Sequence, residues 1–335
     1  MRWRAGLAGI VLAACGCGRY EHFRLPAAAG PSQNVRWVWE PEAEPVLGRG
    51  GVGSFDAVDT LNPSVRKMAS GYVNLYSGWD GKTWRTGLAT SLDGRTWEKK
   101  GQLLQPGPAG WEGSYIAANG SFLAESTGSS YWYQAGSPPQ IGLASSAGLD
   151  RWQKLSQPVL EAGPRGSWEE RGVGDPYVLP VEGKLYMYYL GQDRARRQRL
   201  GLAVSTDGVT WTKSLANPVM ELGGPGSFDE NGLGEPAVWG QFGRWWMLYT
   251  GRDKKEWRRT GLAVSTDGVR WERVGEKALL DVGEGWNSRV VCDPEVELLP
   301  DGRVRVWFGG GDRPEPAENL HGQIGVGVLR PIRLD

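Results

Sequence analysis

The chain has 335 residues, a formal net charge of zero at pH 7 and three cysteines. The balanced charge gives no support to a nucleic-acid or acidic-polymer partner, and three cysteines cannot make a disulfide framework. Fifty-one glycines and eighteen tryptophans, with almost no helical periodicity, indicate many short strands joined by tight turns.

The first fifteen residues predict a secretory signal. Two arginines precede an apolar run over residues 5–14, which is too short to span a bilayer permanently. The run ends at Leu-Ala-Ala-Cys15, which resembles a bacterial lipobox, so we expect lipidation of Cys15; an ordinary signal peptide is the alternative. Residues 16–33 read as a tether. We therefore expect an extracytoplasmic protein of the bacterial cell envelope that meets the membrane only through this anchor.

Residues 34–335 carry a repeated strand motif of the type Gly-Leu-Ala-Val-Ser. Its first glycine falls at positions 87, 142, 201, 261 and 325, at intervals of 55 to 64 residues. A period of this size is typical of a propeller or solenoid. Each period holds four strand signals, the last following a turn that is Asp-Gly in three of the repeats. The sequence therefore predicts an all-β fold, a five-bladed β-propeller with four antiparallel strands per blade.

The two ends of this region predict how the ring closes. The last repeat stops after its third strand, near Ile332. Residues 35–47 match the pattern of a fourth strand, and Trp39 stands one period before Trp97. We expect this N-terminal strand to complete the last blade and leave no open edge there.

A second recurrent position heads the first strand of each repeat. Asn62, Asp175, Glu235 and Asp293 each precede a proline and lie sixteen residues before a strand-closing glycine, and Asn119 occupies an eroded copy. Equal spacing predicts one ring of these ladder residues at one mouth of the propeller channel. Three carboxylates at short range cannot all stay ionised cheaply, so one pKa should rise, as a general acid requires. The alternative is that these acids cap turns or bind a cation.

These motifs resemble the five-bladed propeller glycoside hydrolases, the superfamily of arabinanases, β-xylosidases, invertases and levansucrases, and the related mannoside phosphorylases. In arabinanase-like members, acids in the first, third and fourth blades serve as general base, pKa-tuning Asp and general acid. The resemblance, over about residues 35–335, implies that Glu235 is the acid and Asp175 the tuning residue. Asn62 departs from the pattern, because an amide cannot take a proton from water. Asp59, which has no acidic counterpart in the other repeats, is the candidate base.

Other residues are candidates for substrate contact or for pairing with the acids. Arg171 and Arg289 each stand four residues before a ladder acid, where they would clamp phosphate in a phosphorolysis reaction or pair with the acids. Trp111 is a candidate sugar platform. The resemblance also makes His321 a candidate to hold an ion in the channel, with a structural calcium ion as the open alternative to no metal. We expect the remaining substrate contacts from Asn62, Asn119 and Asp293.

The leading functional hypothesis is a glycoside hydrolase-like propeller that acts on a furanoside or short glycan by acid/base catalysis. The alternatives are a non-catalytic carbohydrate-binding propeller that has lost its base at Asn62, a glycoside phosphorylase, and a protein-interaction scaffold. We expect a monomer whose partner is a carbohydrate, with no required cofactor. An inverting reaction predicts acid and base carboxyl groups roughly 6.5–9.5 Å apart.

Overall fold

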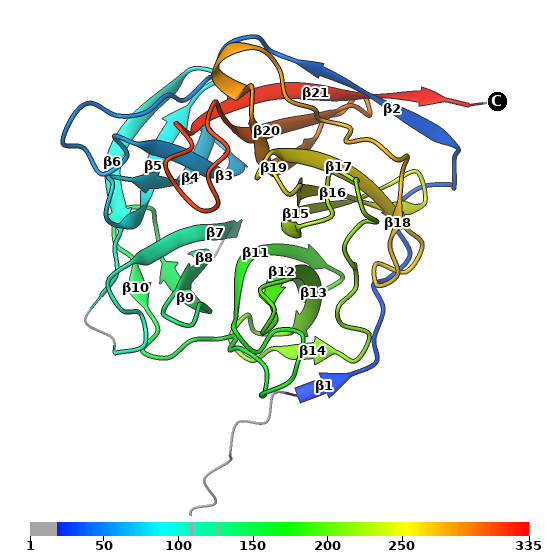
Figure 1. Ribbon diagram of the computed structural model, residues 1–335, viewed down its shortest axis with the longest axis horizontal. Helices are drawn as coiled ribbons and strands as arrows, with labels where there is room; N and C mark the ends of the chain where they lie inside the picture. Colours follow the sequence, from blue (N-terminus) through cyan, green and yellow to red (C-terminus); the bar gives the residue numbers. More distant parts are fainter. Residues whose placement is uncertain (1–18, 108–109, 126–127, 335) are drawn as a thin grey trace, which may run out of the picture.

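The computed structural model describes residues 19–107, 110–125 and 128–334, and it is built almost entirely of β-strands. Five antiparallel sheets radiate from a central channel, as Figure 1 shows in the view down the shortest axis. The predicted five-bladed propeller is confirmed. One short 3-10 turn, Gly285–Asn287, precedes the last blade.

The blades follow the chain in order, each running from the channel outward. Blade 1 holds β3 (Asp59–Met68), β4 (Gly71–Trp79), β5 (Trp84–Ser91) and β6 (Trp97–Leu104). Blade 2 holds β7 (Ile116–Glu125), β8 (Gly128–Ala135), β9 (Gln140–Ser146) and β10 (Gln153–Lys154). Blade 3 holds β11 (Gly172–Val181), β12 (Lys184–Gln192), β13 (Gln198–Ser205) and β14 (Thr212–Ser214). Blade 4 holds β15 (Gly232–Gln241), β16 (Arg244–Arg252), β17 (Arg258–Ser265) and β18 (Glu272–Arg273). Blade 5 holds β19 (Val290–Leu298), β20 (Val304–Gly311), β21 (Gln323–Arg333) and β2 (Val35–Pro41).

The ring closes as the sequence predicts. Strand β2 pairs antiparallel with β21, from Val35 opposite Arg333 to Pro41 opposite Gly327. A further bridge joins Leu47 to Ile324. The first and last strands of the domain thus share one blade (blue and red in Figure 1), so chain closure depends on long-range pairing.

The region expected to be a tether is partly packed structure. Strand β1 (Arg19–Glu21) adds in parallel to β14 at the outer edge of blade 3. Farther along, Leu25 is buried, its N–H donates to the carbonyl of Asp267, and Trp245 Nε1 donates to the carbonyl of Pro26. Residues 19–33 therefore lie against blades 3 and 4 rather than leading freely away, because they carry apolar groups that the propeller edge can bury.

The structure does not test the predicted membrane anchor. The predicted signal peptide and lipidated Cys15 lie outside the described residues. Within the described ranges, no helix is long and apolar enough to cross a bilayer.

Each of the first four blades contains a buried acid held by two partners. The acid comes from the loop before the first strand, accepts a hydrogen bond from a tyrosine of the second strand and pairs with a cation of the fourth strand. Blade 5 carries Asn287 and Phe308 at the equivalent places. Buried charges require such pairing, and it joins the inner and outer strands of one blade. The four sets are Asp56–Tyr76–Lys99, Glu112–Tyr133–Lys154, Glu169–Tyr189–Lys213 and Asp229–Tyr249–Arg273.

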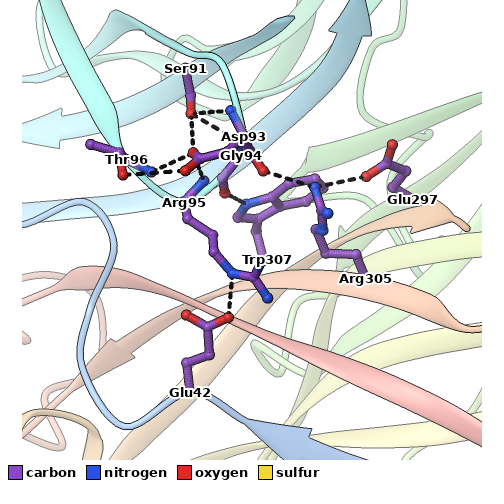
Figure 2. A network of polar contacts seen from close by, with 9 residues as sticks. All are labelled: Glu42, Ser91, Asp93, Gly94, Arg95, Thr96, Glu297, Arg305 and Trp307. Carbon is purple, nitrogen blue, oxygen red and sulfur yellow. Dashed lines mark hydrogen bonds and ion pairs between the residues drawn. The ribbon is translucent and has the colours of Figure 1, made fainter.

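The Asp-Gly turns fasten one blade to the next. At the junction of blades 5 and 1 (Figure 2), the Asp93 carboxylate accepts hydrogen bonds from the backbone of its own turn. The turn places the carbonyl of Gly94 where Trp307 Nε1 donates to it at 2.7 Å, and Arg305 donates to the carbonyl of Asp93. Gly94 has a φ of +75°, which favours glycine. The same latch recurs with Trp132 on Gly208 and Tyr188 on Gly268.

Candidate functional site

The five ladder residues share one unusual backbone conformation. Asn62, Asn119, Asp175, Glu235 and Asp293 have φ between +44° and +50°. In every blade the pairing of the first two strands shifts register at this point, so the ladder residue and its successor form a bulge. A bulge with a left-handed residue re-aims a side chain out of the strand pattern, which is common next to functional sites. The repeated sequence thus encodes a repeated local distortion.

The bulges bring the five ladder side chains to one level of the channel. All five line a pocket of about 210 Å³ and also line the narrower part of the channel beneath it. Around the pocket, Trp84 and Tyr115 form one wall, and the loop 312–322 between β20 and β21 contributes Pro316 to Glu318. This loop lies over the inner end of blade 1 in Figure 1. The pocket is small beside the 300–1,000 Å³ typical of ligand sites, and its size suits roughly one sugar unit.

Three of the ladder residues, Asp175, Glu235 and Asp293, form a cluster of acids. A carboxylate oxygen of Glu235, one of Asp293 and the Sγ of Cys292 lie within 4.8 Å of one another. Burial, together with the charge of Glu235, raises the pKa of Asp175 to about 7. The same two causes raise the pKa of Asp293 well above its usual range. The cluster therefore retains protons near neutral pH, and the titrations of its members are linked.

Hydrogen bonds from the neutral ladder residues orient two of these acids. Asn119 Nδ2 donates to Asp175 Oδ1 at 3.3 Å, and the backbone N–H of Asn62 donates to Asp293 Oδ2 at 3.1 Å. In contrast, Glu235 Oε2 has no hydrogen-bond partner among the described residues. Glu235 is thus the cluster member whose carboxyl group is least engaged by the protein.

The structure does not place Asp59 in the pocket. Its side chain is fully buried, and its two carboxylate oxygens accept hydrogen bonds from the backbone N–H groups of Asn319 (2.6 Å) and Gly322 (2.7 Å). Asp59 therefore holds the loop 312–322 in position. The expectation that it acts as the base is wrong for this reason. Among the described residues, no other blade anchors such a loop, so the other repeats have no need of an acid here.

Two further candidates also lie away from the pocket. Trp111 packs on Tyr133 at the place that Phe55, Trp168 and Phe228 occupy in other blades, so it belongs to the repeated core. Arg289 stacks over Trp257, with 4.6 Å between its guanidinium carbon and the ring centroid. Neither lines the ring pocket, whereas the exposed Arg171 does. The two arginines expected to form a phosphate clamp are therefore not brought together.

A calcium ion in the channel stays a prediction. His321 pairs with Asp312 through Nδ1 at 2.8 Å and does not line the pocket. The group of possible ligands in the described ranges consists of Glu235, Cys292 and Asp293. Calcium takes six to eight oxygen ligands, and a thiol is not among them.

Sequence reasoning missed a set of polar residues on the pocket wall. Arg252 and Arg258 of blade 4 line it, as do Gln192 and Gln198 of blade 3. A run of charged residues after a strand is typical of a solvated loop, so this stretch of the sequence does not indicate a pocket. The repeat of the sequence could have located these residues. The residue three positions before the motif glycine lines the pocket in four blades: Trp84, Pro139, Gln198 and Arg258.

Comparison of the sequence with known proteins finds one matching family model and one curated relative. Residues 72–216 match the model of the glycosyl hydrolases family 32 N-terminal domain. A protein called "Uncharacterized protein Rv1502" from Mycobacterium tuberculosis (strain ATCC 25618 / H37Rv) is 25% identical over 236 residues, covering 67% of this chain and 76% of that protein.

Solved structures resemble the whole domain at low sequence identity. A protein described as "Glycoside hydrolase" superposes with a TM-score of 0.70 and 16% identity, over 88% of this chain and 93% of that one. A thermostable family-43 glycoside hydrolase gives 0.62 and 17%, over 84% and 93%. A third, from work on "the GH130 family of mannoside phosphorylases", which "contains glycoside hydrolases that target beta-1,2 mannosidic linkages in Candida mannan", gives 0.68 and 16%, over 92% and 99%. At such identities the likeness shows the fold.

Proposed function

On the premise that the chain has the five-bladed propeller fold of the glycoside hydrolase superfamily, we propose that it cleaves a glycosidic bond of a short glycan in the ring pocket. The observation that carries the proposal is the convergence of Asp175, Glu235 and Asp293, from three blades, on one small pocket that retains protons near neutral pH. Cleavage of a glycosidic bond needs a protonated carboxyl group beside a second carboxyl group.

In this proposal the members of the cluster have different roles. Glu235, whose Oε2 accepts no hydrogen bond from the described residues, gives a proton to the leaving oxygen. Asp175 holds the shared proton near neutral pH and is kept in place by Asn119. Asp293 and Asn62, which are adjacent in the ring, orient the attacking water. The proton that this water releases passes to the carboxylate of the cluster that is ionised, which restores the proton that Glu235 gave away. These roles require that the pocket take the bond at the end of a glycan, because its volume fits about one sugar unit.

A second candidate function is favoured by the missing base. Asn62 cannot accept a proton from water, and Asp59 is committed to the loop 312–322. A propeller with this ring would bind a sugar without turning it over.

The proposal is tested with a panel of glycans incubated with the protein, in parallel samples with and without phosphate. Release of free sugar in both samples supports hydrolysis. Sugar phosphate formed solely in the phosphate sample would indicate phosphorolysis instead. Binding without any product after long incubation would favour the non-catalytic function and contradict the proposal.

A further inference from the structure

The wall of the pocket contains a buried cation without a carboxylate partner. Arg258 is 7% exposed and lines the pocket. Its Nη2 donates to the backbone carbonyls of Glu315 (3.1 Å) and Pro316 (2.9 Å), while its Nη1 has no hydrogen-bond partner in the part of the chain that the structure describes. A buried charge is costly unless it is paired, so this guanidinium is poised to accept an anion.

The neighbouring Arg252 is better satisfied. Its Nε lies 3.3 Å from Glu256, its Nη2 donates to Gln198 and its Nη1 donates to the carbonyl of Pro316. Arg258 therefore presents to the pocket a positive charge that no carboxylate of the described residues meets in an ion pair, whereas the charge of Arg252 is partly met by Glu256. That charge acts on the ring, since Arg258 is close enough to Asp175 to counter part of the rise in that carboxyl's pKa.

The blade architecture does not require arginine at these positions. Arg252 and Arg258 face each other across the hairpin of blade 4. The equivalent pairs are Gln192 with Gln198 in blade 3 and Trp79 with Trp84 in blade 1. Since neutral residues fill the same register in blades 1 and 3, the hairpin itself does not require these cations. In blade 4 they line the pocket and hold the loop 312–322.

We propose that Arg258, assisted by Arg252, forms a subsite for the carboxylate of an acidic sugar unit of the uronate type. One uncompensated cation matches the single charge of a carboxylate. A phosphate dianion would need further cations, because Glu235 lies on the same pocket. The planar guanidinium also suits the planar carboxylate. The inference rests on the proposed function in one respect, namely that the ligand is a sugar.

The test measures binding without turnover, so that its outcome is separate from that of the activity assay. The full chain carrying Cys15→Ser is titrated at pH 7 with D-glucuronate and D-galacturonate, with D-glucose and D-galactose as neutral counterparts, and with inorganic phosphate. Ligand-detected NMR gives the affinities. We expect a uronate to bind at least about tenfold more tightly than its neutral counterpart, which corresponds to about 1.4 kcal/mol.

Arg258→Gln installs the residue that blade 3 carries naturally at this position. It is expected to abolish the tenfold preference, so that the uronate binds no more tightly than its neutral counterpart. Arg289→Gln, outside the pocket, is the matched control and should retain the preference. Thermal unfolding followed by tryptophan fluorescence checks the fold of each variant; if Arg258→Gln does not fold, Arg252→Gln takes its place.

Three results would overturn the inference: equal affinity of the wild-type chain for acidic and neutral sugars, binding of phosphate with no binding of uronate, or a folded Arg258→Gln variant that keeps the preference. If the protein binds a uronate but releases no sugar from any glycan, the proposed catalysis is contradicted and the uronate subsite is retained. If the protein cleaves neutral glycans alone, the proposed catalysis is retained and the uronate subsite is contradicted.

Discussion

Asp175 shows how a single position connects sequence, backbone strain and chemistry. Its left-handed φ of 44° lifts the side chain out of the strand pattern and into the ring. There, burial and the neighbouring Glu235 raise its pKa to about 7. The conformation that disfavours an ordinary residue is therefore the one that gives this carboxyl its unusual proton affinity.

The raised pKa of Asp175 predicts a particular pH dependence of stability. Because the folded-state pKa lies above the usual value of 3.8, the folded protein binds more protons than the unfolded chain between about pH 4 and pH 7. Stability contributed by this group is thus present below pH 4 and is lost as the pH rises through 7. Asp175→Asn should remove this loss and raise the free energy of unfolding at pH 8 by on the order of 2 kcal/mol.

The measurement is urea unfolding at pH 4, 6 and 8. Asp150→Asn is the control, since the side chain of Asp150 is 83% exposed and its removal should leave the pH profile unchanged. If the free energy of unfolding of the wild-type protein rises from pH 4 to pH 8 in parallel with that of Asp175→Asn, the raised pKa of Asp175 is contradicted.

Each of the first four blades carries its own polar staple, the buried acid with its tyrosine and cation partners. Glu169 in blade 3 is fully buried and lies 2.6 Å from Lys213, and it also accepts hydrogen bonds from Tyr189 and Tyr20. The last of these comes from β1, so the N-terminal segment and the blade core share one acid. Removing one partner of a buried pair leaves an unpaired charge, which costs more than the pair itself contributes.

Lys213→Met should therefore lower the free energy of unfolding by about 3–5 kcal/mol. The matched control is Lys254→Met, because Lys254 is 72% exposed and pairs with Glu230 at the surface. That control should cost less than about 1 kcal/mol. Urea unfolding of both variants at pH 7 decides the point, and similar losses for the two would contradict the role given to the staple.

The sequence predicted elements better than it predicted individual site residues. Periodicity located the blades and the ladder positions, because a repeat must place equivalent residues equivalently. Asp59 was assigned as the catalytic base because the other repeats have no acid at its position. In the structure it anchors a loop that occurs in blade 5 alone among the described residues. Arg258 was missed because its run of charges resembles a solvated turn; the hairpin register that turns it inward is a tertiary property.

The whole propeller depends on closure of its ring of blades. Strand β2 supplies the outer strand of blade 5, and its Trp37 is 4% exposed and packs edge-on against Trp239 and Trp246 of blade 4 at 5.7 Å. The latch between Gly94 and Trp307 fastens the opposite side of blade 5 to blade 1 (Figure 2). The end that joins the ring is thus as much a part of the core as any internal strand.

Two truncations test whether closure needs the N-terminal segment through β2. A chain lacking residues 1–18 retains β1 and β2 and should unfold cooperatively. A chain lacking residues 1–41 loses β2, exposes the edge of β21 and should fail to show a cooperative transition. Differential scanning calorimetry compares the two, and a cooperative transition of similar enthalpy in the shorter chain would contradict closure by pairing of the termini.

The convergence of acids from separate blades on one pocket is the claim on which the functional account depends, and Glu235→Gln tests it most directly. With the glycan that the panel identifies as substrate, initial rates of sugar release are compared for the wild-type and variant proteins at pH 7. The account predicts a loss of at least about 10²-fold for Glu235→Gln, with the thermal transition and the binding of the glycan retained. A variant that folds, binds and still releases sugar at the wild-type rate would contradict it.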